Sequence, residues 1–272
     1  MSKIQKFLPL IIGAVVILLV IGGSISLFHT LFGGSKQPTA TPAPVKHRIT
    51  TPVNIIQPTD RPYLELSPKD IHTVTLSVLE LKKPATSADF ELEYQTGSNL
   101  EGAVGAIPVD KVPASKDILL GSCSAGGACT YNTNVQGGTW TINFSGGPDT
   151  YALKQDWKYV ENKMGDTQFS SRDDYFQIDS ENLANQKILI IYNTPGVPKS
   201  LTGTAISEAY TLTGLNPLKG TAKLSMRLTQ DATNASIMGY DGQTWKEFPT
   251  KVADKTATAQ VDLMRLYVVV KK

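Results

Sequence analysis

The chain has 272 residues, of which 18% are charged and 8% are aromatic, and it contains 22 Gly, 16 Pro, 2 Cys and 3 His. This length allows one or two domains, and the composition is too ordinary for a wholly disordered or low-complexity chain. The formal net charge of +2 gives no reason to expect a nucleic acid as partner, and two cysteines are too few for a disulfide-dense mini-protein.

The N-terminus carries a long apolar segment. Residues 7–35 contain no Lys, Arg, Asp or Glu. About 20 apolar residues in a helix span the ~30 Å hydrocarbon core of a bilayer, so we predict a single transmembrane helix at residues 7–32. Lys3 and Lys6 place the tail, residues 1–6, in the cytoplasm by the positive-inside rule. The bulk of the chain is then expected on the extracytoplasmic side of the plasma membrane.

A cleaved signal peptide is the alternative interpretation of this segment, with Ser24 and Ser26 as the small residues before the cut. The apolar region of a signal peptide runs for about 7–15 residues, and this one is longer, which favours an uncleaved signal-anchor. No Cys follows the apolar run within the next 90 or so residues, so we do not expect a lipid-modified N-terminus.

Residues 33–59 are typical of a linker. Five prolines favour an extended, polyproline-like backbone there, and the intervening Ser, Thr and Ala offer little to bury. About twenty such residues at ~3.1 Å each reach on the order of 60 Å. We therefore expect a stalk that holds the following region away from the membrane.

Apolar and polar residues alternate in residues 60–164, which predicts half-buried β-strands. The apolar positions of three such runs are Val74, Leu76 and Val78; Phe90, Leu92 and Tyr94; and Trp140, Ile142 and Phe144. Turn residues are expected at Thr96–Asn99, Gly137–Gly138 and Gly146–Pro148. Short strands with frequent turns indicate an antiparallel sandwich or barrel.

A second set of strands is expected in residues 165–272. Residues 187–192 include a continuous apolar run, which predicts a central strand buried on both faces. Asp241-Gly242 is typical of a hairpin turn. The predicted fold class is therefore all-β, with two antiparallel, immunoglobulin-like β-sandwich domains at 60–164 and 165–272, carried on the N-terminal transmembrane α-helix.

Segments of the second set follow one another in a particular order: Phe176–Leu183, Ile206–Leu212, Gly220–Met226, Ile237–Trp245, Ala259–Val261 and Tyr267–Val269. This order resembles the supporting β-sandwich of ankyrins and netrin receptors, which recurs in bacterial cell-surface proteins. The resemblance covers residues 165–272 only. It implies a non-enzymatic structural or interaction module on the extracytoplasmic side, and no binding residue is carried over.

Cys123 and Cys129 are the sharpest local feature of the chain. An extracytoplasmic compartment is often oxidising, and the intervening Gly126-Gly127 lets the chain fold back, so we predict a disulfide between them. A loop of about seven residues yields ~2.4 kcal/mol by the chain-entropy relation, so the bond constrains a loop tip. Redox or metal use is the alternative, but a structural zinc site needs four ligands and no His lies nearby.

Catalytic signals are weak. His72 is the one histidine within the predicted sandwiches, and without a partnered motif it reads as an ordinary strand residue. Asp89, Glu91 and Glu93 share one strand face, which is typical of an exposed sheet surface, with a glycosidase pair or a cation site as the alternative. We predict no catalytic residue, no cofactor and no metal ligand, and expect that the protein is not an enzyme.

Four carboxylates lie close in sequence around the expected domain boundary, at Asp166, Asp173, Asp174 and Asp179. A calcium ion that stiffens the junction would use such oxygen ligands, but their spacing does not match the 12-residue calcium loop. The sequence leaves this site open.

Aromatic residues offer one candidate contact surface. Trp140 and Trp245 are expected to anchor the core, whereas Trp157 and Tyr159, in the run Asp-Trp-Lys-Tyr, are less clearly inward. Trp157 and Tyr159 are therefore the residues at which we predict a partner contact.

Together these features predict a membrane-anchored, extracytoplasmic protein with a structural, adhesive or partner-binding role at the cell envelope. Its partner would be an envelope protein or polysaccharide, and its oligomeric state stays open. Two alternatives remain: an envelope glycan hydrolase that uses acidic residues, and an ectodomain subunit of a membrane sensor or assembly complex.

Overall fold

The fold is all-β and antiparallel in a computed structural model that describes residues 50–194 and 196–271. The predicted tail at 1–6, the predicted membrane helix at 7–32 and most of the predicted linker lie outside these residues. The helical turns within them, η1 (Pro58–Asp60) and η2 (Glu181–Leu183), are far too short to cross a membrane.

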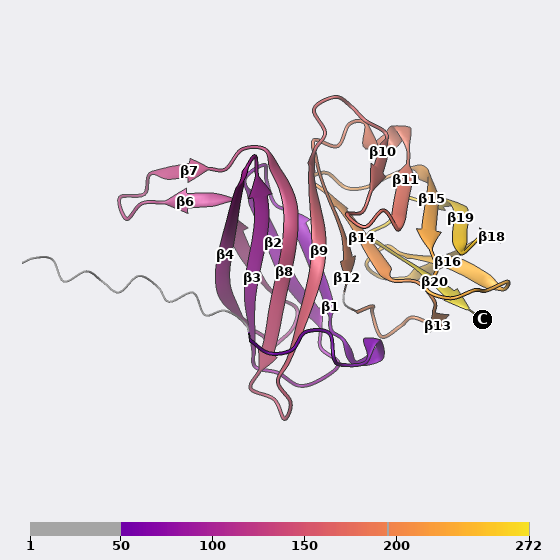
Figure 1. Cartoon of the computed structure of the whole chain (residues 1–272), viewed down its shortest axis with the longest axis horizontal. Coiled ribbons are helices and arrows are strands. Elements are labelled where there is room, and N and C mark those ends of the chain that lie inside the picture. The colour runs from indigo at the N-terminus through magenta and orange to yellow at the C-terminus, as the bar shows by residue number, and fades with distance from the viewer. Residues whose placement is uncertain (1–49, 195, 272) are drawn as a thin grey trace, which may run out of the picture. The chain divides into compact units, whose positions relative to one another are not determined.

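A ten-stranded sheet, here called the central sheet, runs through the described part of the chain (Figure 1). Its strands in spatial order are β17 (Trp245–Phe248), β16 (Ala235–Tyr240), β20 (Leu266–Lys271), β14 (Ala209–Gly214), β12 (Ile188–Thr194), β9 (Tyr151–Glu161), β8 (Val135–Ser145), β3 (Ser87–Thr96) and β4 (Asn99–Pro108), and β13 (Thr204–Ala205) pairs with β20. Strands from both predicted sandwich regions therefore share one sheet.

Two smaller sheets cover parts of the central sheet. The first covering sheet contains β1 (Tyr63–Pro68), β2 (Thr73–Glu80) and β5 (Ala114–Leu119). The second covering sheet contains β10 (Gln168–Ser170), β11 (Phe176–Asp179), β15 (Thr221–Arg227), β19 (Thr256–Asp262) and β18 (Lys251–Ala253). A separate hairpin pairs β6 (Gly121–Cys123) with β7 (Cys129–Tyr131).

Strand β12 is buried on both faces, which confirms the prediction made from its apolar run. Ile190 and Tyr192 lie in the core beneath the first covering sheet. Leu189 and Ile191 lie in the core beneath the second. Because successive side chains of a strand point to opposite faces, the two covering sheets pack on opposite faces of the central sheet.

The period-two patterns predict the buried residues correctly. All nine apolar positions singled out in the first strand set are buried, and their polar neighbours on β2, β3 and β8 are only partly covered. Ala222, Leu224 and Met226 on β15 are buried in the second core. Burying a large apolar side chain contributes about 1.5–3 kcal/mol, so these positions dominate the stability of both layers.

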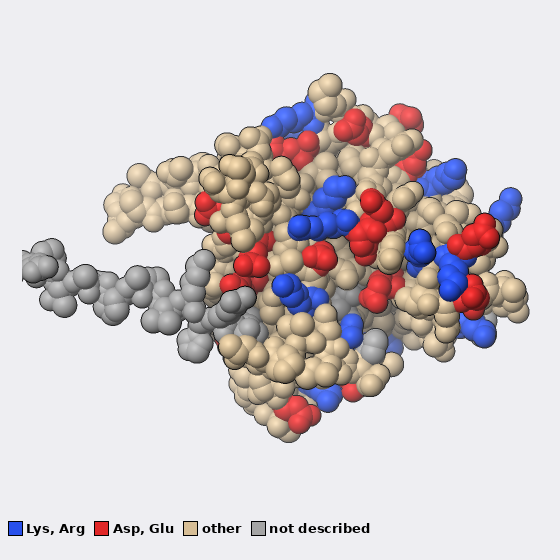
Figure 2. Space-filling view, viewed as in Figure 1, with Lys and Arg blue, Asp and Glu red and all other residues tan. Residues whose placement is uncertain are grey.

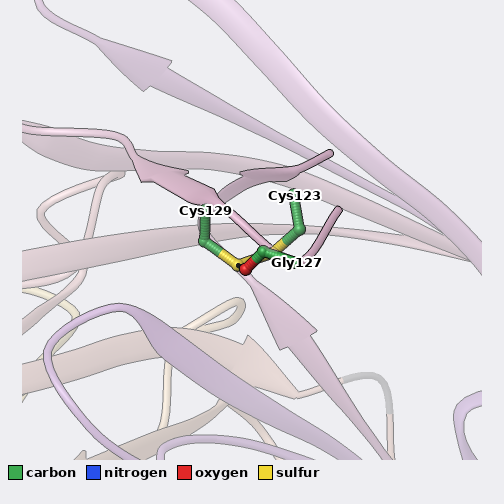
Figure 3. The surroundings of a disulfide bond; sticks show 3 residues. All are labelled: Cys123, Gly127 and Cys129. Carbon is green, nitrogen blue, oxygen red and sulfur yellow. Dashed lines mark hydrogen bonds between the residues drawn. A yellow bond between two sulfur atoms is a disulfide. The ribbon is translucent and has the colours of Figure 1, made fainter. Parts of the chain in front are cut away.

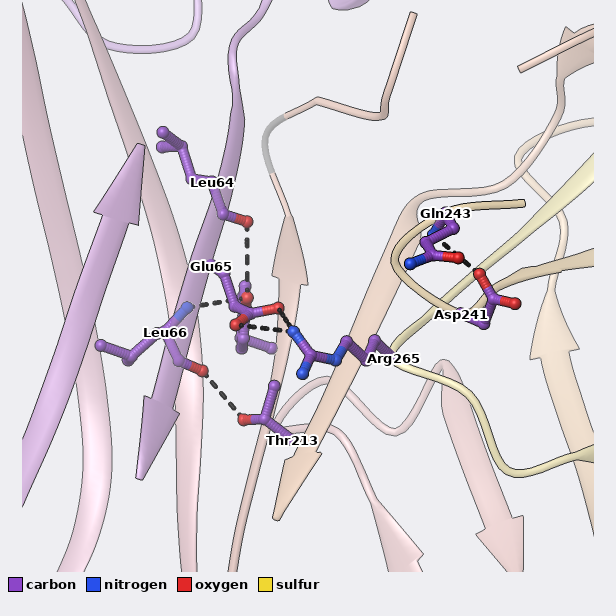
Figure 4. Close-up of polar contacts among 8 residues, drawn as sticks. Leu64, Glu65, Leu66, Thr213, Asp241, Gln243 and Arg265 are labelled. Atoms are coloured by element: carbon purple, nitrogen blue, oxygen red, sulfur yellow. Dashed lines mark hydrogen bonds and ion pairs between the residues drawn. The ribbon is translucent and has the colours of Figure 1, made fainter. Parts of the chain in front are cut away.

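Polar contacts join the first covering sheet to the central sheet (Figure 4). Thr213 Oγ1 donates to the carbonyl of Leu66 at 2.9 Å, and the Leu66 amide donates to the hydroxyl of Tyr192 at 2.9 Å. Arg265 Nη1 lies 3.3 and 3.4 Å from the two carboxylate oxygens of Glu65. The buried edge of β1 is thus fixed to β12, β14 and the segment before β20.

The last residues of the predicted linker contact the central sheet. Val53 forms a parallel bridge with Ala152 at the start of β9. Asn54 extends the pairing, because its amide side chain donates to the Lys154 carbonyl at 3.0 Å and accepts from the Lys154 amide at 3.1 Å. The chain therefore enters the sheet at the 151–154 end of β9.

Tyr151 permits a test of core burial by pH. Its side chain is buried, its hydroxyl has no hydrogen-bond partner among the described residues, and burial raises its pKa to about 12. An unfolded tyrosine ionises near 10, so above that pH the unfolded state binds fewer protons and stability falls as pH rises. We expect Tyr151→Phe to reduce this loss by about 1.4 kcal/mol per pH unit between pH ~10 and ~12. Urea denaturation at several alkaline pH values measures the slope, and an unchanged slope would contradict the burial of this hydroxyl.

Candidate functional site

Several exposed features converge at one end of the central sheet, here called the distal end. β9 runs from Tyr151, next to the point where the linker enters, to Glu161. Eleven residues at ~3.3 Å each cover roughly 35 Å. The distal end is the Glu161 end, and it includes the β6–β7 hairpin and the segments 132–137 and 161–163.

The β6–β7 hairpin is closed by the predicted disulfide. Cys123 and Cys129 are directly paired in register and bonded to each other (Figure 3), with 4.0 Å between their Cα atoms. The hairpin projects away from the sandwich (Figure 1), and every residue from Ser122 to Tyr131 is exposed. The bond therefore holds the shape of a protruding loop, as the sequence predicts.

The base of the hairpin rests on His72. The rings of His72 and Tyr131 are stacked, with centroids 4.2 Å apart. The Leu120 amide donates to the His72 carbonyl at 2.7 Å, and Asn132 Nδ2 donates to the hydroxyl of Tyr94 at 3.0 Å. His72 thus stacks against the hairpin base from the bend that directly precedes β2.

Two neighbouring cavities open at the distal end. The larger, of about 860 Å³, is lined mainly by polar residues, among them Gln136, Lys158 and Arg172. The smaller, of about 500 Å³, lies beside the hairpin base and is lined in part by His72. Asn134, Glu161 and Lys163 line both cavities, and the Lys163 ammonium pairs with the Glu161 carboxylate at 2.6 Å.

The predicted contact residues Trp157 and Tyr159 are buried, which corrects the expectation of a contact surface there. Trp157 is fully buried and Tyr159 is 3% exposed. Trp157 Nε1 donates to the Glu93 carbonyl at 3.1 Å, and the Tyr159 hydroxyl donates to the Ile71 carbonyl at 3.0 Å. Burial raises the pKa of Tyr159 above its usual range. Both rings belong to the first core.

The acidic side chains of β3 lie on the uncovered face of the central sheet. Asp89, Glu91 and Glu93 are all partly exposed, and Glu93 accepts a hydrogen bond from Thr139 Oγ1 at 3.0 Å. Figure 2 shows acidic side chains over β3 and β4, and basic and acidic ones side by side toward β9. Glu91 and Glu93 are not among the residues that line the distal cavities.

The four aspartates near the expected boundary do not form a metal-binding cluster. Among the described residues, no group of three or more His, Cys, Asp or Glu side chains is close enough to hold a metal ion. Asp173 instead accepts hydrogen bonds from the Tyr210 hydroxyl at 2.6 Å and the Tyr175 amide at 3.1 Å. Asp179 accepts from Gln168 Nε2 at 3.1 Å, so these two carboxylates stabilise local structure.

No protein-family model matches the chain, and no curated protein is similar to it. The site therefore depends on its geometry alone. Tyr131, Asn134 and Lys163 were not singled out from the sequence, because their proximity arises from strand pairing between distant segments. Of the features singled out from the sequence, the disulfide-closed loop lies at this end of the sheet, as do Tyr159, which lines the larger cavity, and His72, which lines the smaller.

Proposed function

We propose that this protein is a membrane-anchored, extracytoplasmic binding module with a structural or adhesive role at the cell envelope. The observation that carries the proposal is the exposed hairpin Gly121–Tyr131, closed by its disulfide and placed at the end of the sheet opposite the linker. Loops that bind partners are commonly positioned in this way by a rigid scaffold.

The positions of the linker and the hairpin at opposite ends of β9 support this role. The linker reaches the central sheet beside Ala152, and the hairpin and both distal cavities lie at the other end of β9. The membrane helix that the sequence predicts at residues 7–32 would anchor the chain on the linker side. Two immunoglobulin-like regions at 60–164 and 165–272, joined through the central sheet and the second resembling the supporting sandwich of ankyrins, would form the scaffold.

The expected partner is an envelope protein or polysaccharide. Binding of the purified full-length chain to isolated envelope fragments tests this, with fragments digested by a protease in one arm and by glycan hydrolases in the other. We expect saturable binding that one of the two digestions removes. Binding that survives both digestions, or none at all, would contradict the proposal.

A variant without the disulfide tests most directly whether the hairpin binds the partner. In the double variant Cys123→Ser with Cys129→Ser, we expect the free energy of unfolding to fall by no more than about 2–3 kcal/mol, because the closed loop is short. Envelope binding should fall at least about tenfold, because the loop loses its fixed shape. Unchanged binding in the folded double variant would show that the partner contacts another surface.

The hydrolase alternative has a separate test. Glu91→Gln with Glu93→Gln leaves the shape of the face unchanged while removing two of its three acidic charges. If the wild-type chain hydrolysed an envelope glycan and this variant did not, the binding role would give way to the enzymatic one. An accessible domain also follows from the proposal: protease added outside intact cells should reach residues 60–272.

A further inference from the structure

Strand β4 forms one edge of the central sheet (Figure 1). It is ten residues long and pairs with β3 in an unbroken register from Asn99 to Pro108. No other described strand pairs with it. An edge of this length presents a row of backbone donors and acceptors to any further strand.

The register shows which backbone groups point outward. Thr96 and Asn99 close the two-residue turn, and the Val109 amide donates to the Thr86 carbonyl at 2.9 Å in the same register. Because hydrogen-bonded positions alternate along an antiparallel strand, the odd-numbered residues of β4 bond to β3. The outward-facing backbone groups belong to the even-numbered residues Leu100, Gly102, Val104, Ala106 and Pro108, of which Pro108 contributes only a carbonyl.

Other sheet edges in the described residues are short, carry charged residues or, like β1 (Tyr63–Pro68), are held against the central sheet. β17 has four residues, two of them the charged pair Lys246 and Glu247, and β10 and β18 have three each. β5 carries Lys116 and Asp117 at its centre. Short length and charge are the usual means of preventing edge-to-edge pairing. β4 has ten residues and a single charged one, Glu101.

The side chains of β4 leave room for another backbone. Five of its ten residues are Gly, Ala or Val. Gly105 is required by the core, since a Cβ there would lie 2.7 Å from the Phe90 ring. Leu100 and Val104 are 66% and 54% exposed on the outer face, which is unusual for large apolar side chains next to an unpaired ladder.

We propose that β4 pairs antiparallel with β4 of a second copy of this chain, which joins two central sheets across a two-fold axis. With Ala103 opposite Ala103 of the second copy, nine residues of each strand overlap and Leu100 faces Ala106. Each Glu101 then lies opposite Gly105, and the two Glu101 carboxylates stand about 13 Å apart along the ladder. That separation exceeds the Debye length at physiological salt, so repulsion between the two Glu101 carboxylates is largely screened.

The outward amides also make the pairing self-complementary. Val104 faces Gly102 and Gly102 faces Val104, so each copy supplies donors and acceptors where the other needs them. One strand pair buries less than a standard interface of about 1,600 Å², and we expect a weak dimer with a dissociation constant on the order of 100 µM. Attachment of both copies to one membrane would raise their effective concentration.

Sedimentation equilibrium of the full-length chain in detergent micelles, over a roughly hundredfold range of concentration, tests the proposal. The mass should rise from monomer to dimer. Val104→Pro removes an outward donor without removing a bond to β3, and it should raise the dissociation constant at least about tenfold. Val104→Thr is the matched control and should dimerise like the wild type.

Val104→Lys provides a second disruption that keeps the backbone intact. It places two ammonium groups near each other across the axis, so it should also prevent dimerisation. Hydrogen exchange of the Leu100, Gly102 and Ala106 amides should slow as the wild-type concentration rises. A wild-type chain that stays monomeric, or a dimer that persists in both disrupted variants, would overturn the proposal.

Discussion

Replacing Trp157 with Ala is expected to lower the free energy of unfolding by about 3–5 kcal/mol. The indole is fully buried, packs edge-on against Tyr94 and Tyr159 at centroid distances of 6.3 and 6.4 Å, and donates to the Glu93 carbonyl. Removing it leaves a cavity in the first core and removes the side-chain hydrogen bond to the Glu93 carbonyl. Urea denaturation of wild type and variant, with circular dichroism as the signal, measures the change.

Tyr175→Ala is the matched control, because Tyr175 is 46% exposed. Its ring lies 5.2 Å from the Arg227 guanidinium at the surface, so its loss should cost no more than about 1 kcal/mol. If Trp157→Ala left stability unchanged and abolished envelope binding, the side chain would be a contact residue after all. A large loss of stability places it in the core.

The alternation of apolar and polar residues predicted strands and their buried faces well. Val74, Leu76 and Val78 were placed correctly because a two-residue period depends only on neighbouring positions. The burial of β12 on both faces followed from its continuous apolar run. The disulfide followed from two cysteines six residues apart with glycines between them.

The same alternation would have placed Trp157 and Tyr159 inward. Along β9, Leu153, Trp157 and Tyr159 are buried, while Lys154 and Lys158 lie on the opposite face. The short run Asp-Trp-Lys-Tyr hides this pattern, which is clear only over the full eleven-residue strand. The contact prediction for Trp157 and Tyr159 was therefore wrong because it was based on a run of only four residues.

The glycines at 137 and 138 show a limit of local reasoning. They were expected in a turn but lie within β8. A Cβ at Gly137 would lie 2.3 Å from the Trp157 carbonyl oxygen, and one at Gly138 would lie 2.3 Å from the Glu93 carbonyl oxygen. The close approach of β9 and β3 on either side requires glycine there, and this contact between distant segments has no local sequence signal. The continuation of one sheet through both strand sets likewise arises from contacts between distant segments, which no local sequence pattern indicates.

Ile190→Ala and Ile191→Ala should each lower the free energy of unfolding by about 2–5 kcal/mol. Both side chains are fully buried on β12, but Ile190 faces the first core and Ile191 faces the second. Because β12 is hydrogen-bonded to β9 on one side and β14 on the other, a loss in either core should weaken the whole sheet. We expect one cooperative transition that both variants shift.

Probes in the two halves distinguish this result from independent domains. Trp140 lies in the first core, and Trp245 packs against the apolar cluster around Tyr240 on the opposite half of the sheet. In single-tryptophan versions of the chain, both fluorescence signals should change at the same urea concentration, and either isoleucine variant should lower both midpoints together. Ile71→Ala, at a side chain that is 53% exposed, should leave the free energy of unfolding within about 0.5 kcal/mol of the wild-type value.

If Ile190→Ala moved only the Trp140 signal and Ile191→Ala only the Trp245 signal, residues 60–164 and 165–272 would unfold as separate domains despite their shared sheet. Coincident shifts would instead mean that the two cores unfold as one unit through the shared ten-stranded sheet.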